Sequence, residues 1–531
     1  MRRVKSLSLI TILIAFFVMF SFMMIEKVVA EEPQYGGTLH LSNNTDWDTL
    51  DPAYCSGFDA GAMAVKFYDG LVRFDYHSND VVPALAKSWD VEENNTLFTF
   101  YLREDVEFHD GTEFTAHDVK YSFDRLYNPE VASPGTWVYP MIKGTDASLN
   151  NETNGLKGVK VIDKYTVQFE LDKPFGLFLT HLTLPYGLIV NEDIVEKYGD
   201  DFRQNPVGTG PFKFVSWEHD DRLVMEANEN YWDGRPYVDE VMYRVIPQPL
   251  TDIAEFEAGN LDLTTVPTEE RERWLGNDEW QQYIHTMAEL STYYLALNGD
   301  FEPLDDPKVK KAIDYAIDSQ MVTESLFSHY VAANDAIPEG MPGGADVEFK
   351  ADIKKAKELL AEAGYPDGFE LELWVSDGST SVRVGGVLQA LLGRIGIKVD
   401  LIKNDWSVFY STVKNGNAPS YYLSWWADYA DPYNFLNALY TSDRIAFNNE
   451  TINTMLGKMA ATTDQTERIR LSQEIIKMTD QIGDPYVFLY HTSASSIKQP
   501  WIKGEIYHQM YNADKLVTWW IDQDIKAQEM K

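Results

Sequence analysis

The stretch FELELWVSDGSTSVRVGGVLQALLGRIGIKVDLI, residues 369–402, has the pattern of a strand, a helix and a second strand. Residues 369–375 and 397–402 are short apolar runs, and residues 380–395 between them have the length and apolar content of a helix. Strands joined through a helix pair in parallel, and ligands bind beyond the carboxyl ends of such strands. The stretch therefore predicts an α/β fold with a ligand site near residues 376–378.

A further strand pattern, SYYLSWW over residues 420–426, leads into Ala427, Asp428 and the turn-forming Asp431 and Pro432. If this strand joins the same sheet, Asp428 lies at the same edge as the 376–378 loop. A carboxylate beside aromatic side chains suits the capture of a cation. The alternative is that Asp428 only caps a turn and that the aromatic run is a core strand.

Other segments give clear local predictions. Residues 97–102 and 166–171 alternate as strands, and residues 212–217 and 222–227 predict a hairpin around the polar turn at 219–221. Helices are predicted after Asp306, where Pro307 suits the first turn, over residues 352–363 before Gly364, and over residues 464–482. The last fifty residues have strand and loop character.

The N-terminus has the order of a secretory signal: a basic start, an apolar run over residues 7–25, and Val28 and Ala30 before Glu31. We expect cleavage after residue 30 and export to the periplasm. An uncleaved anchor is the alternative, because about 20 apolar residues can span a membrane.

The rest of the chain is strongly acidic. Residues 1–30 hold four of the 45 basic and one of the 83 acidic residues, so the mature formal charge is −41. Such a surface repels nucleic acid and anionic lipid. Five hundred residues are too many for one core, and the single cysteine, Cys55, excludes an internal disulfide.

No catalytic or metal-binding motif is recognisable. The ten histidines show no paired helical spacing, and the GTGPF turn at residues 208–212 lacks the lysine and helix of a phosphate loop. We therefore predict no catalytic residue, no metal and no cofactor, which favours a binding protein over an enzyme.

Ordered segments along the whole mature chain carry a resemblance to a known family. They are YGGTLHL (35–41), PALAKSW (83–89), FTFYLREDVEFHDGTEFTAHDVKYSFDR (98–125), NPVGTGPFKF (205–214), NYWDGRP (230–236), LDDPKVKKAIDYAID (304–318), AKELLAEAGYPDGF (356–369) and WWADYADPYNF (425–435). In this order they resemble the extracytoplasmic solute-binding proteins of ABC importers, the family 5 receptors for dipeptides, oligopeptides and nickel.

The resemblance implies an α/β, two-lobed clamp with an additional subdomain in its first lobe. The first lobe would comprise residues 31–290, with the extra subdomain at about 76–204, and residues 488–531. The second lobe would comprise residues 291–487. Two chain crossings would form a hinge that closes around the ligand.

The resemblance also implies ligand contacts. In peptide-binding members an Asp at the position of Asp428 holds the ligand's ammonium, and Trp425, Trp426 and Ala427 match positions that supply walls and backbone hydrogen bonds. Arg383 is the nearest match to an arginine that binds the ligand's carboxylate. Because neighbouring strand residues point to opposite faces, we expect at most one of the two tryptophans to face the pocket and the other to be core.

The sequence thus predicts a monomeric periplasmic receptor that captures di- or oligopeptides and delivers them to a membrane-embedded ABC permease. Within the family the alternative is a non-peptide ligand such as an oligosaccharide, an opine or a nickel complex. Outside the family it is a secreted glycosidase, which acidic and aromatic residues alone would support.

Overall fold

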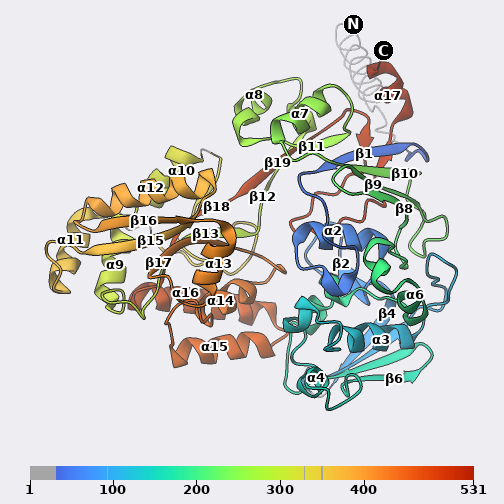
Figure 1. Cartoon of the computed structure of the whole chain (residues 1–531), viewed down its shortest axis with the longest axis horizontal. Helices are drawn as coiled ribbons and strands as arrows, with labels where there is room; N and C mark the ends of the chain where they lie inside the picture. Colours follow the sequence, from blue (N-terminus) through green and yellow to red (C-terminus); the bar gives the residue numbers. More distant parts are fainter. Residues whose placement is uncertain (1–31, 93, 328, 349–350, 531) are drawn as a thin grey trace, which may run out of the picture.

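The chain forms two lobes that lie side by side in the computed structural model (Figure 1). The structure describes residues 32–92, 94–327, 329–348 and 351–530, so the predicted signal over residues 1–30 lies outside the described residues. Among the described residues, no helix is long and apolar enough to cross a membrane.

One lobe is built on a six-stranded mixed sheet in the order β14-β18-β13-β17-β15-β16. Apolar residues of α9, α11 and α12 pack in one cluster with the sheet, and those of α13 to α16 pack in another. The strands are β13 (Ser291–Leu297), β14 (Val331–Ala332), β15 (Glu370–Ser376), β16 (Lys398–Asn404), β17 (Ser420–Trp426) and β18 (Tyr486–His491). The helices are α9 (Pro307–Ala316), α10 (Ser319–Leu326), α11 (Ile353–Glu362), α12 (Ser379–Gly393), α13 (Trp406–Lys414), α14 (Pro432–Tyr440), α15 (Glu450–Ala461) and α16 (Gln465–Ile482).

The predicted strand–helix–strand unit is confirmed. β15 and β16 are parallel and joined through α12, with Glu370 opposite Lys398 at the start and Ser376 opposite Asn404 at the end. β17 also pairs in parallel with β15, through Leu373 and Ser420. Asp428 and the 376–378 loop therefore lie at the same edge of the sheet, as expected.

The other lobe contains two four-stranded sheets and several shorter pieces. The first sheet, in the order β1-β10-β9-β8, includes the predicted hairpin β8–β9, and the second has the order β4-β5-β7-β6. The strands are β1 (Thr38–Asn43), β2 (Val72–Phe74), β3 (Val81–Pro83), β4 (Ala86–Glu92), β5 (Leu97–Leu102), β6 (Val159–Asp163), β7 (Thr166–Glu170), β8 (Phe212–Glu218), β9 (Arg222–Ala227) and β10 (Glu240–Val245). The helices are α2 (Phe58–Phe67), α3 (Ala116–Leu126), α4 (Thr145–Leu149), α5 (Phe178–His181), α6 (Glu192–Tyr198), α7 (Pro249–Glu257) and α8 (Arg271–Leu275), with short 3₁₀ turns at Pro134–Trp137 and Pro185–Gly187.

The two lobes are joined by strands of a third sheet. This sheet has the order β11-β19-β12, from β11 (Leu263–Thr265), β12 (Ile284–Ala288) and β19 (Ser493–Lys498). The chain leaves it from β12 into β13 and returns to it from β18 into β19 (Figure 1). Beyond β20 (Ile502–Lys503) and β21 (Trp520–Ile521), the C-terminal segment forms helix α17 (Gln523–Glu529). That helix was not expected from a segment with strand and loop character.

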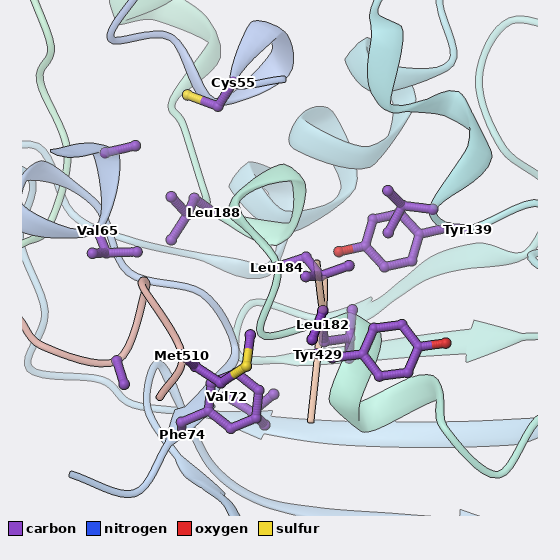
Figure 2. Packing of buried hydrophobic residues seen from close by; sticks show 14 of the residues in the cluster. Cys55, Val65, Val72, Phe74, Tyr139, Leu182, Leu184, Leu188, Tyr429 and Met510 are labelled. Carbon is purple, nitrogen blue, oxygen red and sulfur yellow. The ribbon is translucent and has the colours of Figure 1, made fainter. Parts of the chain in front are cut away.

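The lobes also touch each other away from these joining strands. Tyr429, which follows β17, is buried beside Leu182 and Leu184 of the other lobe (Figure 2), and its ring centroid lies 4.7 Å from that of His181. The backbone N–H of Gly176 donates to the carbonyl of Ala460 at the end of α15 over 2.8 Å. The structure therefore shows an arrangement in which the lobes are in contact.

Candidate functional site

The site begins where β17 ends at the seam between the lobes. The N–H of Ala427 donates to the carbonyl of Leu290 over 2.9 Å, which extends the sheet by one residue. The chain then turns into α14, whose first residue is Pro432 and whose cap is Asp431. Asp428 lies inside this turn, between the last sheet hydrogen bond and the helix.

Asp431 has a structural role. Its carboxylate caps α14 by accepting from the N–H of Tyr433 over 2.9 Å, and it binds Nε of Arg468 over 2.8 Å. Both members of this ion pair are buried, with 5% of Asp431 and 9% of Arg468 side-chain surface exposed. In this turn, Asp431 thus caps the helix and pairs with a cationic side chain.

Asp428 is held differently. Its Oδ2 accepts from Nδ2 of Asn434 over 3.0 Å, and the same amide's Oδ1 accepts from Nε1 of Trp425 over 2.9 Å. Among the residues that the structure describes, no Lys, Arg or His nitrogen lies within 4.0 Å of the Asp428 carboxylate. Burial therefore raises the pKa of Asp428 above its ordinary value, although the Asn434 hydrogen bond and a hydrogen bond from the backbone N–H of Asp428 itself act in the opposite direction.

Three cavities lie around the end of β17, and two of them border Asp428. A cavity of about 200 Å³ lies between Asp428 and the other lobe, and its wall includes Cys55, Phe58, Tyr186 and Tyr511. A second, of about 1210 Å³, also reaches Asp428 and extends between α14, α15 and the segment that holds Phe175. A third, of about 910 Å³, shares Tyr511 with the first and extends toward β11 and β19. Asp428 is thus the one predicted site residue that borders two of the three.

The two tryptophans lie on opposite faces of β17, as the strand pattern predicts. Trp425 borders the 1210 Å³ cavity, with the Arg444 guanidinium 5.8 Å from its ring centroid. Trp426 borders the 910 Å³ cavity, with the ring of Phe58 at 6.0 Å. Trp425 is also partly buried against the large core cluster, so the expectation that one of the two tryptophans is core stays a prediction.

Arg383 is not brought to this point of the molecule. Its side chain is exposed on α12, and its guanidinium lies 5.4 Å from the ring centroid of Phe327. It borders none of the three cavities around Asp428. Its role as a carboxylate partner stays a prediction.

Several residues at the site were not found by sequence reasoning. Trp137, Tyr186 and Tyr511 border the smallest cavity but come from three distant segments, none of which has a pattern of its own. Cys55 is buried, as expected, and its thiol donates to the carbonyl of Asp51 over 3.4 Å. In the described part of the chain, no group of three or more His, Cys, Asp or Glu residues could hold a metal ion.

Comparison with known proteins identifies the family. The model of the middle region of bacterial extracellular solute-binding proteins, family 5, matches residues 80–447. The chain belongs to this family. Family 5 proteins are solute-binding proteins of ABC importers, so the predictions of the family and of a binding protein rather than an enzyme are confirmed.

Relatives and solved structures agree with this assignment. The chain is 29% identical over 479 residues to heme-binding protein A of Haemophilus influenzae, which covers 85% of this chain and 86% of that one. It is 27% identical over 514 residues to the dipeptide-binding protein of Escherichia coli, with 91% and 94% covered. A solved structure of the periplasmic binding protein DppA of Helicobacter pylori, in complex with the peptide STSA, superimposes with a TM-score of 0.76 at 27% identity and covers 92% of this chain and 99% of that one. The predicted α/β, two-lobed clamp is thereby confirmed.

Proposed function

We propose that this solute-binding protein captures peptides with a free amino terminus between its lobes, and that the carboxylate of Asp428 holds the peptide's ammonium. The observation that carries this proposal is the contrast within one turn. Asp431 is paired with Arg468, whereas Asp428, three residues earlier, faces a cavity without a cationic partner among the described residues. Relatives whose names refer to dipeptides and oligopeptides support peptides as the ligand class.

The physical argument rests on the charge of Asp428. A carboxylate withdrawn from water raises the free energy of the protein unless a cation or hydrogen bonds compensate it. One amide hydrogen bond from Asn434 is a partial compensation. An ammonium placed in the adjoining cavity would supply the missing charge, so ligand binding would remove a penalty that the empty protein carries.

The neighbouring residues would shape the rest of the site. We propose that Trp425 and Trp426 form walls on its two sides. The N–H of Ala427 is occupied by Leu290, which leaves the carbonyl of Ala427 for the ligand. The cavities of 1210 and 910 Å³ would hold side chains together with water, which suits broad specificity.

The division of the chain and its cellular role complete the proposal. We propose a first lobe of residues 31–290 and 488–531, with an extra subdomain at about 76–204, and a second lobe of residues 291–487. The passages from β12 to β13 and from β18 to β19 support a hinge at these borders. The protein would be exported by a cleavable signal over residues 1–30, remain a monomer in the periplasm, and deliver its ligand to an ABC permease.

The test is ligand binding by the refolded, ligand-free mature protein. We would measure melting shifts with pools of di- to pentapeptides, and with free amino acids, oligosaccharides, nickel and heme as parallel pools. Saturating ligand at 100 times its Kd stabilises the folded state by about 2.7 kcal/mol. We expect peptides to raise the Tm and Asp428→Asn to weaken peptide binding by about 2 to 5 kcal/mol.

A matched control is available in the same cavity. Asp443 also borders the 1210 Å³ cavity but is exposed, so Asp443→Asn makes the same charge change and should leave affinity unchanged. A melting shift with another pool and none with peptides would overturn the peptide proposal and leave the family assignment intact.

Arg383 requires a separate test. α12 begins at the sheet edge where β17 also ends, so we propose that Arg383 reaches the carboxylate of an extended ligand. Arg383→Ala should then weaken binding of peptides with a free carboxyl terminus but not of the same peptides with an amidated terminus. Equal losses for both forms, or no loss, would remove Arg383 from the site.

A further inference from the structure

The 200 Å³ cavity beside Asp428 has two tyrosines whose hydroxyl groups have no hydrogen-bond partner among the described residues. Tyr186 comes from the 3₁₀ turn Pro185–Gly187, and Tyr511 from the C-terminal segment after β20. Both tyrosines are half-buried in the wall of this cavity. Both phenols are therefore free to accept a hydrogen bond from a ligand.

Both tyrosines line the same cavity as Asp428, and the charge of this carboxylate acts on both phenols. Burial raises the pKa of Tyr186 and of Tyr511, and the negative charge of Asp428 adds to the rise in each case. Asp428, Tyr186 and Tyr511 thus border one small cavity. Cys55, whose pKa is also raised by burial, is the remaining titratable side chain on this wall.

Two glycines hold the tyrosine rings in place. A Cβ on Gly135 would lie 2.1 Å from Cδ1 of Tyr186, so this ring packs directly on the backbone of the Pro134–Trp137 turn. A Cβ on Gly61 of α2 would lie 2.8 Å from Cε2 of Tyr511. The ring of Phe58 meets Tyr511 edge-on, with centroids 4.7 Å apart and planes at 80°. Both rings are therefore oriented before any ligand arrives.

We propose that Tyr186, Tyr511 and Asp428 form a three-acceptor socket for a primary ammonium, and that the two tyrosines make the receptor selective for an unsubstituted amino terminus. This inference rests on the proposed function and names two further residues of that same site.

The chemistry of the socket explains the selectivity. A primary ammonium has three N–H donors, and one carboxylate oxygen with two phenol oxygens can accept all three. A trimethylated ammonium has the same charge and fits aromatic walls through cation–π attraction, but it donates no hydrogen bond. The two phenol oxygens therefore distinguish the two kinds of cation, whereas Asp428 attracts both.

The experiment compares two hydroxyl deletions against two forms of one ligand. The probes are the peptide with the largest melting shift in the pools above and its N-trimethylated form, titrated calorimetrically into the mature protein. We expect Tyr186→Phe and Tyr511→Phe each to lower the affinity for the free peptide about tenfold, because a hydrogen bond to a charged group is lost. Neither change should alter the affinity of the trimethylated form.

Controls separate this effect from a general disturbance of the site. Tyr35 is exposed and borders none of the three cavities, so Tyr35→Phe should leave both affinities unchanged. A Cβ on Gly61 would lie 2.7 Å from Cγ of Pro185 and 2.8 Å from the Tyr511 ring, so Gly61→Ala disturbs both tyrosines and should weaken binding of the free peptide at least as much as Tyr511→Phe does. Melting curves of all variants without ligand show whether each one folds.

Each outcome decides between the two proposals. If Asp428→Asn weakens binding of the free peptide but both tyrosine variants bind that peptide like the original protein, the socket is overturned and the peptide receptor stands. If the tyrosine variants weaken both probes equally, their role is structural and the selectivity is overturned. If no peptide binds, the proposed function fails, and the socket is then tested by comparing ethylammonium with tetramethylammonium at equal ionic strength. The socket stands if only ethylammonium shifts the Tm and if both tyrosine variants abolish that shift. Any other result overturns it.

Discussion

Asp428 and Asp431 carry the same charge three residues apart, yet their contacts predict opposite effects on stability. Asp431→Asn keeps an oxygen for capping α14 but leaves the buried Arg468 without its partner. Breaking such a pair lowers the free energy of unfolding by about 3 to 5 kcal/mol. We expect this loss in urea titrations of the ligand-free protein.

For Asp428 the same substitution should not destabilise. An Asp whose pKa is raised in the folded state favours folding at low pH, and this contribution is lost as pH rises through the raised pKa. At neutral pH the charged carboxylate therefore destabilises the folded state, and Asp428→Asn should keep or raise the free energy of unfolding. A loss as large as that of Asp431→Asn would show that Asp428 is structural.

The raised pKa of Asp428 also predicts how ligand affinity changes with pH. An ammonium binds the charged carboxylate, so affinity should be greatest at neutral pH and fall as pH drops through the pKa of the empty protein, above the ordinary Asp range. The nearby Tyr186, Tyr511 and Cys55 all have raised pKa values and stay protonated in this window. Calorimetry from pH 7 to 4 should show this fall, and Asp428→Asn should flatten it.

At the residue scale, the sequence could predict Asp428 because its neighbours form one continuous signal. A strand, a turn and a cap lie next to each other in the chain, and they fix which way the turn faces. Tyr186 and Tyr511 have no such signal, since a tyrosine is ordinary in either segment. The two residues are 325 positions apart in the sequence, and only folding brings them to one cavity. Long-range contacts of this kind depend on how whole lobes pack.

At the scale of elements, α12 contains two neighbouring glycines with opposite surroundings. Gly385 faces the sheet, where a Cβ would lie 2.7 Å from Cδ1 of Leu401, whereas nothing lies within 4 Å of a Cβ on Gly386. Gly385→Leu should lower the free energy of unfolding by about 1 to 3 kcal/mol through overpacking. Gly386→Leu should raise it by about 0.5 to 1 kcal/mol, because leucine favours a helix over glycine.

Chemical denaturation of the two variants checks this pair of effects. The refolded variants should keep the secondary structure content of the original protein by circular dichroism. Equal changes of the same sign would contradict the close packing of α12 on β15 and β16.

Elements were predictable where capping and periodicity agreed. Asp306 accepts from the N–H of Lys308 and Pro307 opens α9, while Asp352 caps α11 and Gly364 follows it with a φ of +95°. The C-terminal helix α17 was missed although Asp522 caps it. Its segment is short and polar, with no buried residue in the helix, so it lacks the apolar period on which the other predictions depended.

For the whole molecule, the contact between the lobes bears on the proposed closure of the cleft. Besides the Gly176 bond, Nδ2 of Asn95 donates to the carbonyl of Ala461 over 3.3 Å. These two donors meet carbonyls at the C-terminal end of α15, where a helix leaves carbonyls without partners. Contact between the lobes therefore satisfies polar groups that water must satisfy when the lobes separate.

Gly176→Ala should shift the protein toward an open cleft. A Cβ at this position would lie 2.1 Å from the carbonyl oxygen of Thr462 and 2.7 Å from the N–H nitrogen of Thr463, and backbone atoms cannot rotate away as a side chain can. The lobes must then move apart at this point, so the binding-competent population falls and the apparent Kd rises in proportion. We expect weaker peptide binding and a larger radius of gyration in solution scattering with peptide present.

Gly457→Ala is the matched control. Gly457 lies on α15 and borders the 1210 Å³ cavity, and a Cβ at this position would have open space around it, so this variant should change neither quantity. If Gly176→Ala also changes neither, the lobes do not close through this contact when they hold a ligand.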